Sequence, residues 1–237
     1  KLRIYYMKKI ILSQIVLGFV LINCQEKTTE KPNSTVNVAS NNIAKNNNSK
    51  LDFKELKFGS NIEEVLKGIG LTINDNALDD YNISGDYEEF QFPKNKKLNL
   101  SIAGNTISSS DNISFFYFKE NKKIWCYEME LINHKDSDKI ISSITKSIGS
   151  KPAFVEKIVN TKERPIFLDE NGEPKTDHIE ETKEVWEDSK NKVTYFFINT
   201  VNHSKNDGKL KIYALDKSSP KYKEWVSYRS FDMFYNK

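Results

Sequence analysis

The sequence predicts an α+β protein made of two tandem units, each a short helix packed on an antiparallel sheet of three or four strands. Residues 58–70 and 138–149 have the apolar spacing of an amphipathic helix, and both segments end at a glycine. Each is followed by runs in which apolar and polar residues alternate, as in half-buried antiparallel strands. The same order of elements therefore occurs twice, which we interpret as a repeated unit.

Residues 1–23, which precede these units, are typical of a signal peptide. Lys8 and Lys9 are followed by an apolar run over 10–22. A bilayer-spanning helix needs about 20 apolar residues, so this run is short for a span and fits a secretory segment. Residues 1–6 come before Met7 and are interpreted as an upstream extension of the reading frame.

The apolar run ends in Leu21-Ile22-Asn23-Cys24, which resembles the lipobox of bacterial envelope lipoproteins. The resemblance implies a diacylglyceryl group on the Cys24 sulfur, cleavage before Cys24 and acylation (often palmitate) of the new amino terminus. An ordinary signal peptide with an incidental cysteine is the alternative. Because more than one acyl chain makes membrane attachment long-lived, we expect a protein anchored to the outer membrane at Cys24 without spanning it.

Residues 24–50 contain the lipidated cysteine and a segment rich in Asn, Ser, Thr and Lys that lacks aromatic residues. Such a segment buries too little apolar surface to offset its ordering entropy, so we expect a disordered tether. The whole chain has 36 basic and 33 acidic residues. Cleavage before Cys24 removes four basic residues and no acidic one, leaving 32 against 33. This balance gives no reason to expect a nucleic-acid partner.

The first unit is expected over residues 51–135. Ser60 is the expected N-cap, with Glu63 completing a capping box, and Gly70 the expected left-handed C-terminal residue. The apolar face of this helix consists of Ile62, Val65, Leu66 and Ile69. Strands are expected within 88–93 and 97–104.

Residues 113–132 predict a hairpin that turns at Glu120-Asn121-Lys122. In its second strand, large residues alternate onto one face: Trp125, Tyr127, Met129 and Leu131. The opposite face receives Cys126, Glu128 and Glu130. No histidine lies near Cys126 in the sequence, so we expect a partly buried, unreactive thiol.

The second unit is expected over residues 136–237. Asp138 is the expected N-cap of its helix and Gly149 the C-cap residue, with Pro152 just beyond. The apolar face of this helix consists of Ile141, Ile144 and Ile148. The strands that follow are expected at 154–160, on both sides of a turn at Asn171-Gly172, on both sides of a turn near Ser189-Lys190-Asn191, and at 208–216.

The carboxyl-terminal segment predicts a short helix and then an edge strand. Ser219 followed by Pro220 is a helix-start signal. The expected helical face consists of Tyr222, Trp225, Val226 and Arg229. Phe231, Met233 and Tyr235 alternate as in a strand.

The stretch from Phe58-Gly59-Ser60 through Val65-Leu66 to Gly70 resembles the first helix of small outer-membrane lipoproteins of the SmpA/BamE-like kind. A duplicated unit of this type also occurs in β-lactamase-inhibitor-like proteins. The resemblance covers about thirteen residues, and residues 138–152 more loosely. It implies an architecture and a compartment and transfers no functional residue.

The sequence shows no pattern of catalytic residues, no cofactor motif and no zinc-ligand spacing. The three histidines, His134, His178 and His203, lie in polar surroundings that suggest loops. Asp177, His178, Glu180 and Glu181 form a cluster that suits either a solvated loop or a metal ion, and we expect the loop. The calcium-like stretch 168–174 lacks the ligand spacing of a calcium loop, and a β-turn explains it.

We therefore expect a non-enzymatic envelope protein that binds another envelope protein through a sheet face. The alternative is a surface or periplasmic binder of a small molecule or glycan. The many aromatic residues fit both hypotheses, because they can fill a core or form a recognition surface.

Overall fold

The structure is a computed structural model that describes residues 50–78, 85–132 and 136–234. For residues 161–167 it describes the backbone alone. The expected signal peptide, Cys24 and the tether up to residue 49 lie outside the described residues, as does His134. No described helix combines the length and apolar character needed to cross a bilayer.

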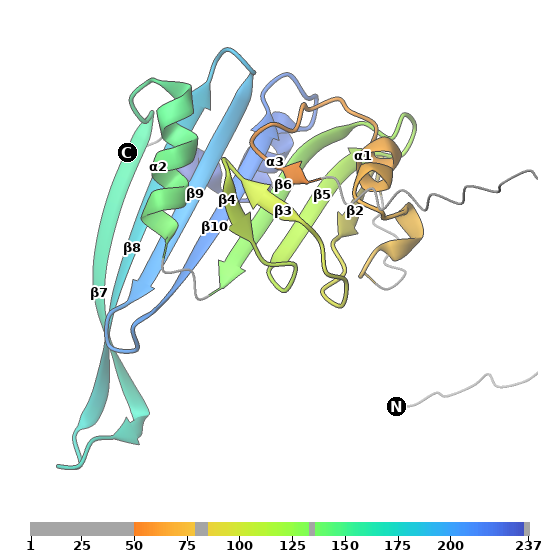
Figure 1. Cartoon of the computed structure of the whole chain (residues 1–237). Coiled ribbons are helices and arrows are strands. Elements are labelled where there is room, and N and C mark those ends of the chain that lie inside the picture. Colours follow the sequence, from red (N-terminus) through yellow and green to blue (C-terminus); the bar gives the residue numbers. More distant parts are fainter. Residues whose placement is uncertain (1–49, 79–84, 133–135, 235–237) are drawn as a thin grey trace, which may run out of the picture. The chain divides into compact units, whose positions relative to one another are not determined.

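The described residues form an α+β fold with one large sheet (Figure 1). Seven strands hydrogen-bond in the order β2-β5-β6-β10-β9-β8-β7, all antiparallel. Their bounds are β2 Tyr87–Gln91, β5 Asn112–Phe118, β6 Ile124–Ile132, β7 Phe154–Leu168, β8 Pro174–Asp188, β9 Val193–Asn202 and β10 Asp207–Asp216. A second sheet of three short strands, in the order β1-β3-β4, consists of Leu51–Asp52, Leu100–Ile102 and Asn105–Ile107.

Two helices and the small sheet cover one face of the large sheet, here called the inner face. The helices are α1 (Ile62–Gly68) and α2 (Ser137–Ile148), and a 3₁₀ turn, Ile73–Asp75, follows α1. Leu66 of α1 and Ile144 of α2 are completely buried, and both belong to one continuous cluster with the inner-face residues of the strands. The main core therefore lies on this side of the sheet.

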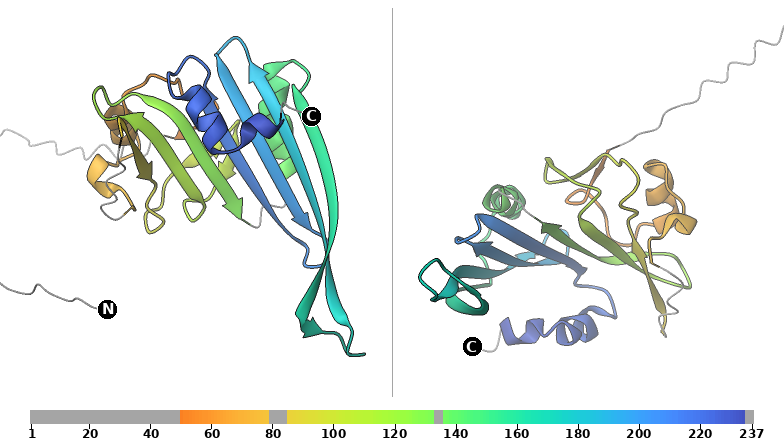
Figure 2. Two further views of the ribbon diagram at one scale, coloured as in Figure 1. Left: turned by 180° about the vertical axis from the view of Figure 1, so that it is seen from behind. Right: turned by 90° about the horizontal axis from the view of Figure 1, so that it is seen from below.

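The opposite face, here called the outer face, is partly covered by the carboxyl-terminal segment. This segment consists of α3 (Tyr222–Tyr228) and a 3₁₀ turn, η2 (Phe231–Phe234). Figure 2 shows both on the opposite side of the sheet from α2. Trp225 and Phe231 pack against Phe116, Trp125 and Phe196 of the strands in a second buried cluster.

The sheet continues across the expected boundary between the two units. Strands β2, β5 and β6 come from the first half of the chain, β7 to β10 come from the second, and β6 pairs with β10 in the middle. The α+β class is thus confirmed. The expected division into two units, each with its own sheet, is not confirmed, because strands of both halves form one sheet. Strands β6 and β10 pair because each has a row of backbone N–H and C=O groups along the edge that faces the other. Pairing gives these groups hydrogen-bond partners.

Both expected helices are present, with different caps. The side chain of Asn61, rather than that of Ser60, accepts a hydrogen bond from the Glu63 backbone at the start of α1. The backbone amides of Gly70 and Leu71 close its other end onto Lys67 and Leu66, as in a Schellman motif. The N-cap of α2 is Asp136, so Asp138 lies in the first turn, while Gly149 has the expected left-handed conformation at φ 71°.

The expected hairpins at 113–132 and around 189–191 are confirmed, as is the turn at Asn171-Gly172. The alternation expected in β6 is interrupted at Trp125. The register with β5 shifts there, so that Trp125 joins Cys126 on the outer face instead of Tyr127 on the inner face. A β-bulge inserts one residue in this way and reverses the faces of the residues before it.

The prediction of a carboxyl-terminal strand after α3 is wrong, because residues Phe231–Phe234 form a 3₁₀ turn. Residues Phe231 and Phe234 are buried and Met233 is 63 % exposed, which is the spacing of a helical turn rather than of a strand. Tyr235 lies outside the described residues. The turn places Phe231 and Phe234 on the same side, where both pack against Phe196. A strand would point these two side chains to opposite sides and would bury less apolar surface.

Candidate functional site

The outer face carries a half-buried carboxylate beside α3. Glu128 of β6 accepts hydrogen bonds from Trp225 Nε1 at 2.9 Å and from Arg229 Nε and Nη2 at 3.0 and 2.6 Å. The Arg229 guanidinium also lies 4.9 Å from the Trp225 ring and 5.2 Å from the Tyr228 ring. These contacts hold the end of α3 against the middle of the sheet.

Burial raises the pKa of Glu128 to about 6, although the Arg229 charge and the hydrogen bonds from Trp225 and Arg229 act in the opposite direction. The side chain of Glu128 is only 15 % exposed, so the loss of hydration outweighs the ion pair. This carboxyl therefore changes charge nearer to neutral pH than an ordinary glutamate.

Beyond α3 and η2, the outer face of the sheet has no covering element among the described residues. Two rows of side chains cross the strands there, and we call them the open region. The first row is Asn112, Glu130, Lys211, Ile198, Lys183 and Glu156, and the second is Ile132, Lys209, Thr200, Glu181 and Ile158.

Charges within the open region pair with one another. Glu130 contacts Lys209 at 3.5 Å and Lys211 at 3.3 Å. Lys183 lies 3.4 Å from Glu181 and 4.0 Å from Glu156. The paired charges leave the surface nearly neutral and partly desolvated, with isoleucines at its centre and both ends.

Two cavities lie where the open region meets the carboxyl-terminal segment. One, of about 540 Å³, has Ile198, Phe231, Met233 and Phe234 among its lining residues together with Lys183 and Lys211. The other, of about 340 Å³, is lined by Glu128, Tyr213 and several polar side chains of β2 and β5. Both have mixed polar and apolar linings.

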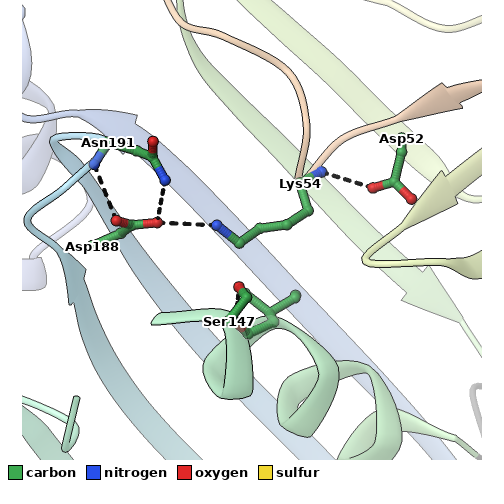
Figure 3. A network of polar contacts seen from close by, with 6 residues as sticks. Asp52, Lys54, Ser147, Asp188 and Asn191 are labelled. Atoms are coloured by element: carbon green, nitrogen blue, oxygen red, sulfur yellow. Dashed lines mark hydrogen bonds and ion pairs between the residues drawn. The ribbon is translucent and has the colours of Figure 1, made fainter. Parts of the chain in front are cut away.

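A third cavity lies at the carboxyl end of α2, beside a buried ion pair (Figure 3). Lys54 Nζ lies 3.0 Å from Asp188 Oδ2, and the two side chains are 8 % and 6 % exposed. Asp188 also accepts hydrogen bonds from Asn191 N at 3.1 Å and Asn191 Nδ2 at 2.8 Å. The Lys54 ammonium lies 5.3 Å from the centre of the Tyr195 ring.

The pKa values of this pair indicate that both side chains are charged. Burial alone would lower the pKa of Lys54, but the nearby Tyr195 side chain, the charge of Asp188 and the hydrogen bond to Asp188 raise it above its usual value. Burial would likewise raise the pKa of Asp188, but the hydrogen bonds from Asn191 and Lys54 lower it below its usual value. The pair is therefore a fixed, ionised feature of the cavity wall.

The segment that carries Lys54 is held in place by Asp52. Its carboxylate accepts hydrogen bonds from Lys54 N, Ser101 Oγ and the backbone amides of Ala103 and Gly104. These bonds lower the pKa of Asp52 against the opposing effect of burial, which is the largest single contribution. The turn after β1 thus directs Lys54 toward Asp188 (Figure 3).

The residues singled out in the sequence lie elsewhere. Cys126 is completely buried, and burial raises the pKa of its thiol well above the usual value. His178 and the acidic residues around it lie on β8 rather than in a loop. Glu180 of that cluster contacts Lys157 and His203 on neighbouring elements. No group of three or more potential metal ligands comes together in the described part of the chain.

Sequence reasoning missed both charged sites. Lys54 and Asp188 are 134 residues apart, so their contact has no local signal. Glu128 lies between apolar neighbours in β6, in the sequence Cys126-Tyr127-Glu128-Met129. A charge inside such a run is the one signal that marks a half-buried carboxylate.

No family model, curated protein or solved structure matches the chain.

Proposed function

We propose that this chain is a non-enzymatic lipoprotein of the cell envelope, anchored to the outer membrane at Cys24, that binds another envelope protein through the open region. The observation that supports this proposal is the part of the outer face that no described element covers, with its nearly neutral, internally paired charges. A protein partner that displaces water from such a surface leaves few charges without a counterpart.

The carboxyl-terminal segment, which meets the open region at Arg229 and Met233, has the residue types that dominate protein interfaces. Tyr228 is 69 % exposed and Met233 is 63 % exposed, and both lie on the segment that carries Arg229. Tyrosine and arginine are enriched among residues that contribute most binding energy, and methionine adapts to irregular partner surfaces. We assign these three residues as the anchoring points of the interface.

The sequence supports the membrane part of the proposal. A cysteine at the end of a short apolar run suits lipid attachment, and a polar tether of residues 25–50 leaves the folded part free to meet a partner. Neither role calls for catalytic residues or a cofactor.

We further propose that the two halves of the chain derive from one duplicated unit, as the resemblance to β-lactamase-inhibitor-like proteins implies. The order β2-β5-β6 is mirrored by β8-β9-β10 about the central β6–β10 pair. Each set follows a helix that ends at a left-handed glycine, Gly70 or Gly149. In this arrangement the open region extends across both units.

Site-specific photocrosslinking tests the proposed interface in intact cells. A photoreactive amino acid replaces Lys209 in the open region, and a matched variant carries it at Lys146, which is exposed on α2 over the inner face. We expect one defined crosslinked protein from position 209 and not from position 146. Crosslinking from 146 alone, or from neither position, would contradict the proposal.

A Cys24→Ala variant tests the anchor separately. We expect the variant to leave the membrane fraction or to accumulate as unprocessed precursor, while the parent chain stays with the membranes. Mass spectrometry of the mature parent chain is the direct check, because an unmodified Cys24 would contradict lipidation.

A further inference from the structure

The cavity beside Lys54 and Asp188 has the features of a small-ligand site. It has a volume of about 480 Å³, within the usual range of ligand pockets. Its walls come from the turn after β1, the end of α2, the β8–β9 turn and the segment after β10. It shares no lining residue with the open region.

The buried pair offers hydrogen-bonding groups that are fixed in place. An ammonium group has three donors, and the hydrogen bond to Asp188 uses one of those of Lys54. The side chain of Asn191 donates to Asp188, and its amide oxygen points away from the pair (Figure 3). The cavity wall therefore offers a ligand donors on Lys54 and an acceptor on Asn191.

The charges around the cavity nearly cancel. Its basic lining residues are Lys54, Lys57, Lys190 and Lys192, and its acidic ones are Glu55, Asp188 and Asp216. An anion needs an excess of donors, and a cation needs an excess of carboxylates. An even mixture of donors and acceptors instead matches hydroxyl groups, each of which both donates and accepts.

Part of the wall is apolar. Phe58, Leu56, Ile148 and Val193 line the cavity beside the polar groups. Phe58 is half-buried and stacks on Tyr127, with ring centres 5.9 Å apart, so its position is fixed. A sugar ring likewise combines polar and apolar surfaces, because its hydroxyl groups lie at the edge of the ring and its C–H groups lie on the faces.

We propose that this cavity binds a neutral sugar of one or two rings. Lys54 donates to a ligand hydroxyl, the Asn191 amide oxygen accepts from one, and Phe58 packs on the apolar face of the ring. This binding site is additional to the protein interface and does not depend on it.

Saturation-transfer difference NMR and calorimetry on the full chain test the proposal. The probes are maltose, cellobiose and N-acetylglucosamine at up to about 10 mM, a concentration that detects weak binding with a Kd of roughly 1–10 mM. Citrate and inorganic phosphate are the anionic comparison. We expect saturable binding of at least one sugar and weaker binding of both anions.

Matched variants locate the binding. Asn191→Ala removes the acceptor and is expected to weaken sugar binding at least tenfold. Asn121→Ala is the control, because Asn121 occupies the corresponding place in the β5–β6 turn, away from the cavity. Its side chain accepts a hydrogen bond from Lys123 N. The lysine that follows the asparagine has a φ of 57° in both turns. The control is expected to bind as the parent does.

The combined Lys57→Glu and Lys190→Glu exchange separates the two ligand classes, since both lysines are exposed and line the cavity. It should leave sugar binding within about twofold of the parent chain while abolishing any anion binding. The proposal is overturned if no sugar binds, if anions bind more tightly, or if Asn191→Ala binds normally with an unchanged melting temperature. None of these results bears on crosslinking at position 209.

Discussion

The buried pair of Lys54 and Asp188 is expected to show strong energetic coupling in a double-mutant cycle. Lys54→Met leaves the Asp188 carboxylate, 6 % exposed, with only the two Asn191 donors. Asp188→Asn leaves the Lys54 ammonium, 8 % exposed, without its counter-charge. Removing one partner of a buried pair costs about 3–5 kcal/mol, and we expect about 3 for each variant because the cavity admits water.

The double variant Lys54→Met/Asp188→Asn leaves no uncompensated charge. Its expected cost is about 3–4 kcal/mol, well below the roughly 6 kcal/mol expected if the two effects were independent. For a domain of this size, each single variant should lower the melting temperature by about 6–12 °C.

Urea unfolding of the four proteins, followed by tryptophan fluorescence, measures the cycle. The exposed pair Lys96 and Asp75, 2.6 Å apart with side chains 43 % and 25 % exposed, is the control. The matching cycle there, Lys96→Met with Asp75→Asn, should give a coupling below about 1 kcal/mol. If the effects at Lys54 and Asp188 add within about 0.5 kcal/mol, the reasoning is refuted and the pair is solvated in the cavity.

Three further predictions concern the two faces of the sheet. The folded-state pKa of Glu128, about 6, exceeds its ordinary 4.5, so the folded state binds this proton more tightly; protonation of Glu128 should therefore add roughly 1.5 kcal/mol to the free energy of unfolding as pH falls from 7 to 4.5. In Glu128→Gln, chemical unfolding across that range should show this rise removed, and a rise equal to that of the parent would contradict the assignment. Leu66→Ala and Ile144→Ala should each cost about 2–5 kcal/mol in urea unfolding, because both side chains are completely buried. Their costs should add within about 0.5 kcal/mol if each helix packs in its own unit, and stronger coupling would argue against duplication. In a Cys24→Ser background, Cys126 should resist iodoacetamide until the chain unfolds, since its thiol is buried and its pKa raised; rapid labelling of folded protein would disprove this.

Local patterns were sufficient where the signal lies within one element. The glycine that ends α2 and the turn between β5 and β6 were predicted correctly, because a left-handed C-terminal residue and a short polar turn depend on neighbouring residues alone. The bulge at Trp125 was not predictable in this way. It depends on how β5 and β6 align, and a shift of one residue leaves no mark in the local alternation.

The carboxyl-terminal segment shows the same limit. Phe231 and Met233 alternate as in a strand, yet Phe231 and Phe234 are the residues that become buried, because the outer face of a sheet formed elsewhere in the chain offers them apolar contacts. Pattern alone does not indicate which surface a segment will meet.

The α+β class, the two helices, the hairpins and the expectation of a lipid anchor follow from local sequence patterns, since each depends on residues close together in the chain. Three features appear only in the folded chain: strands of both halves form one sheet, Lys54 contacts Asp188, and α3 encloses Glu128. These features are pairings between distant segments, and their free energy comes from desolvation and hydrogen bonds that exist only after the chain has brought the partners together.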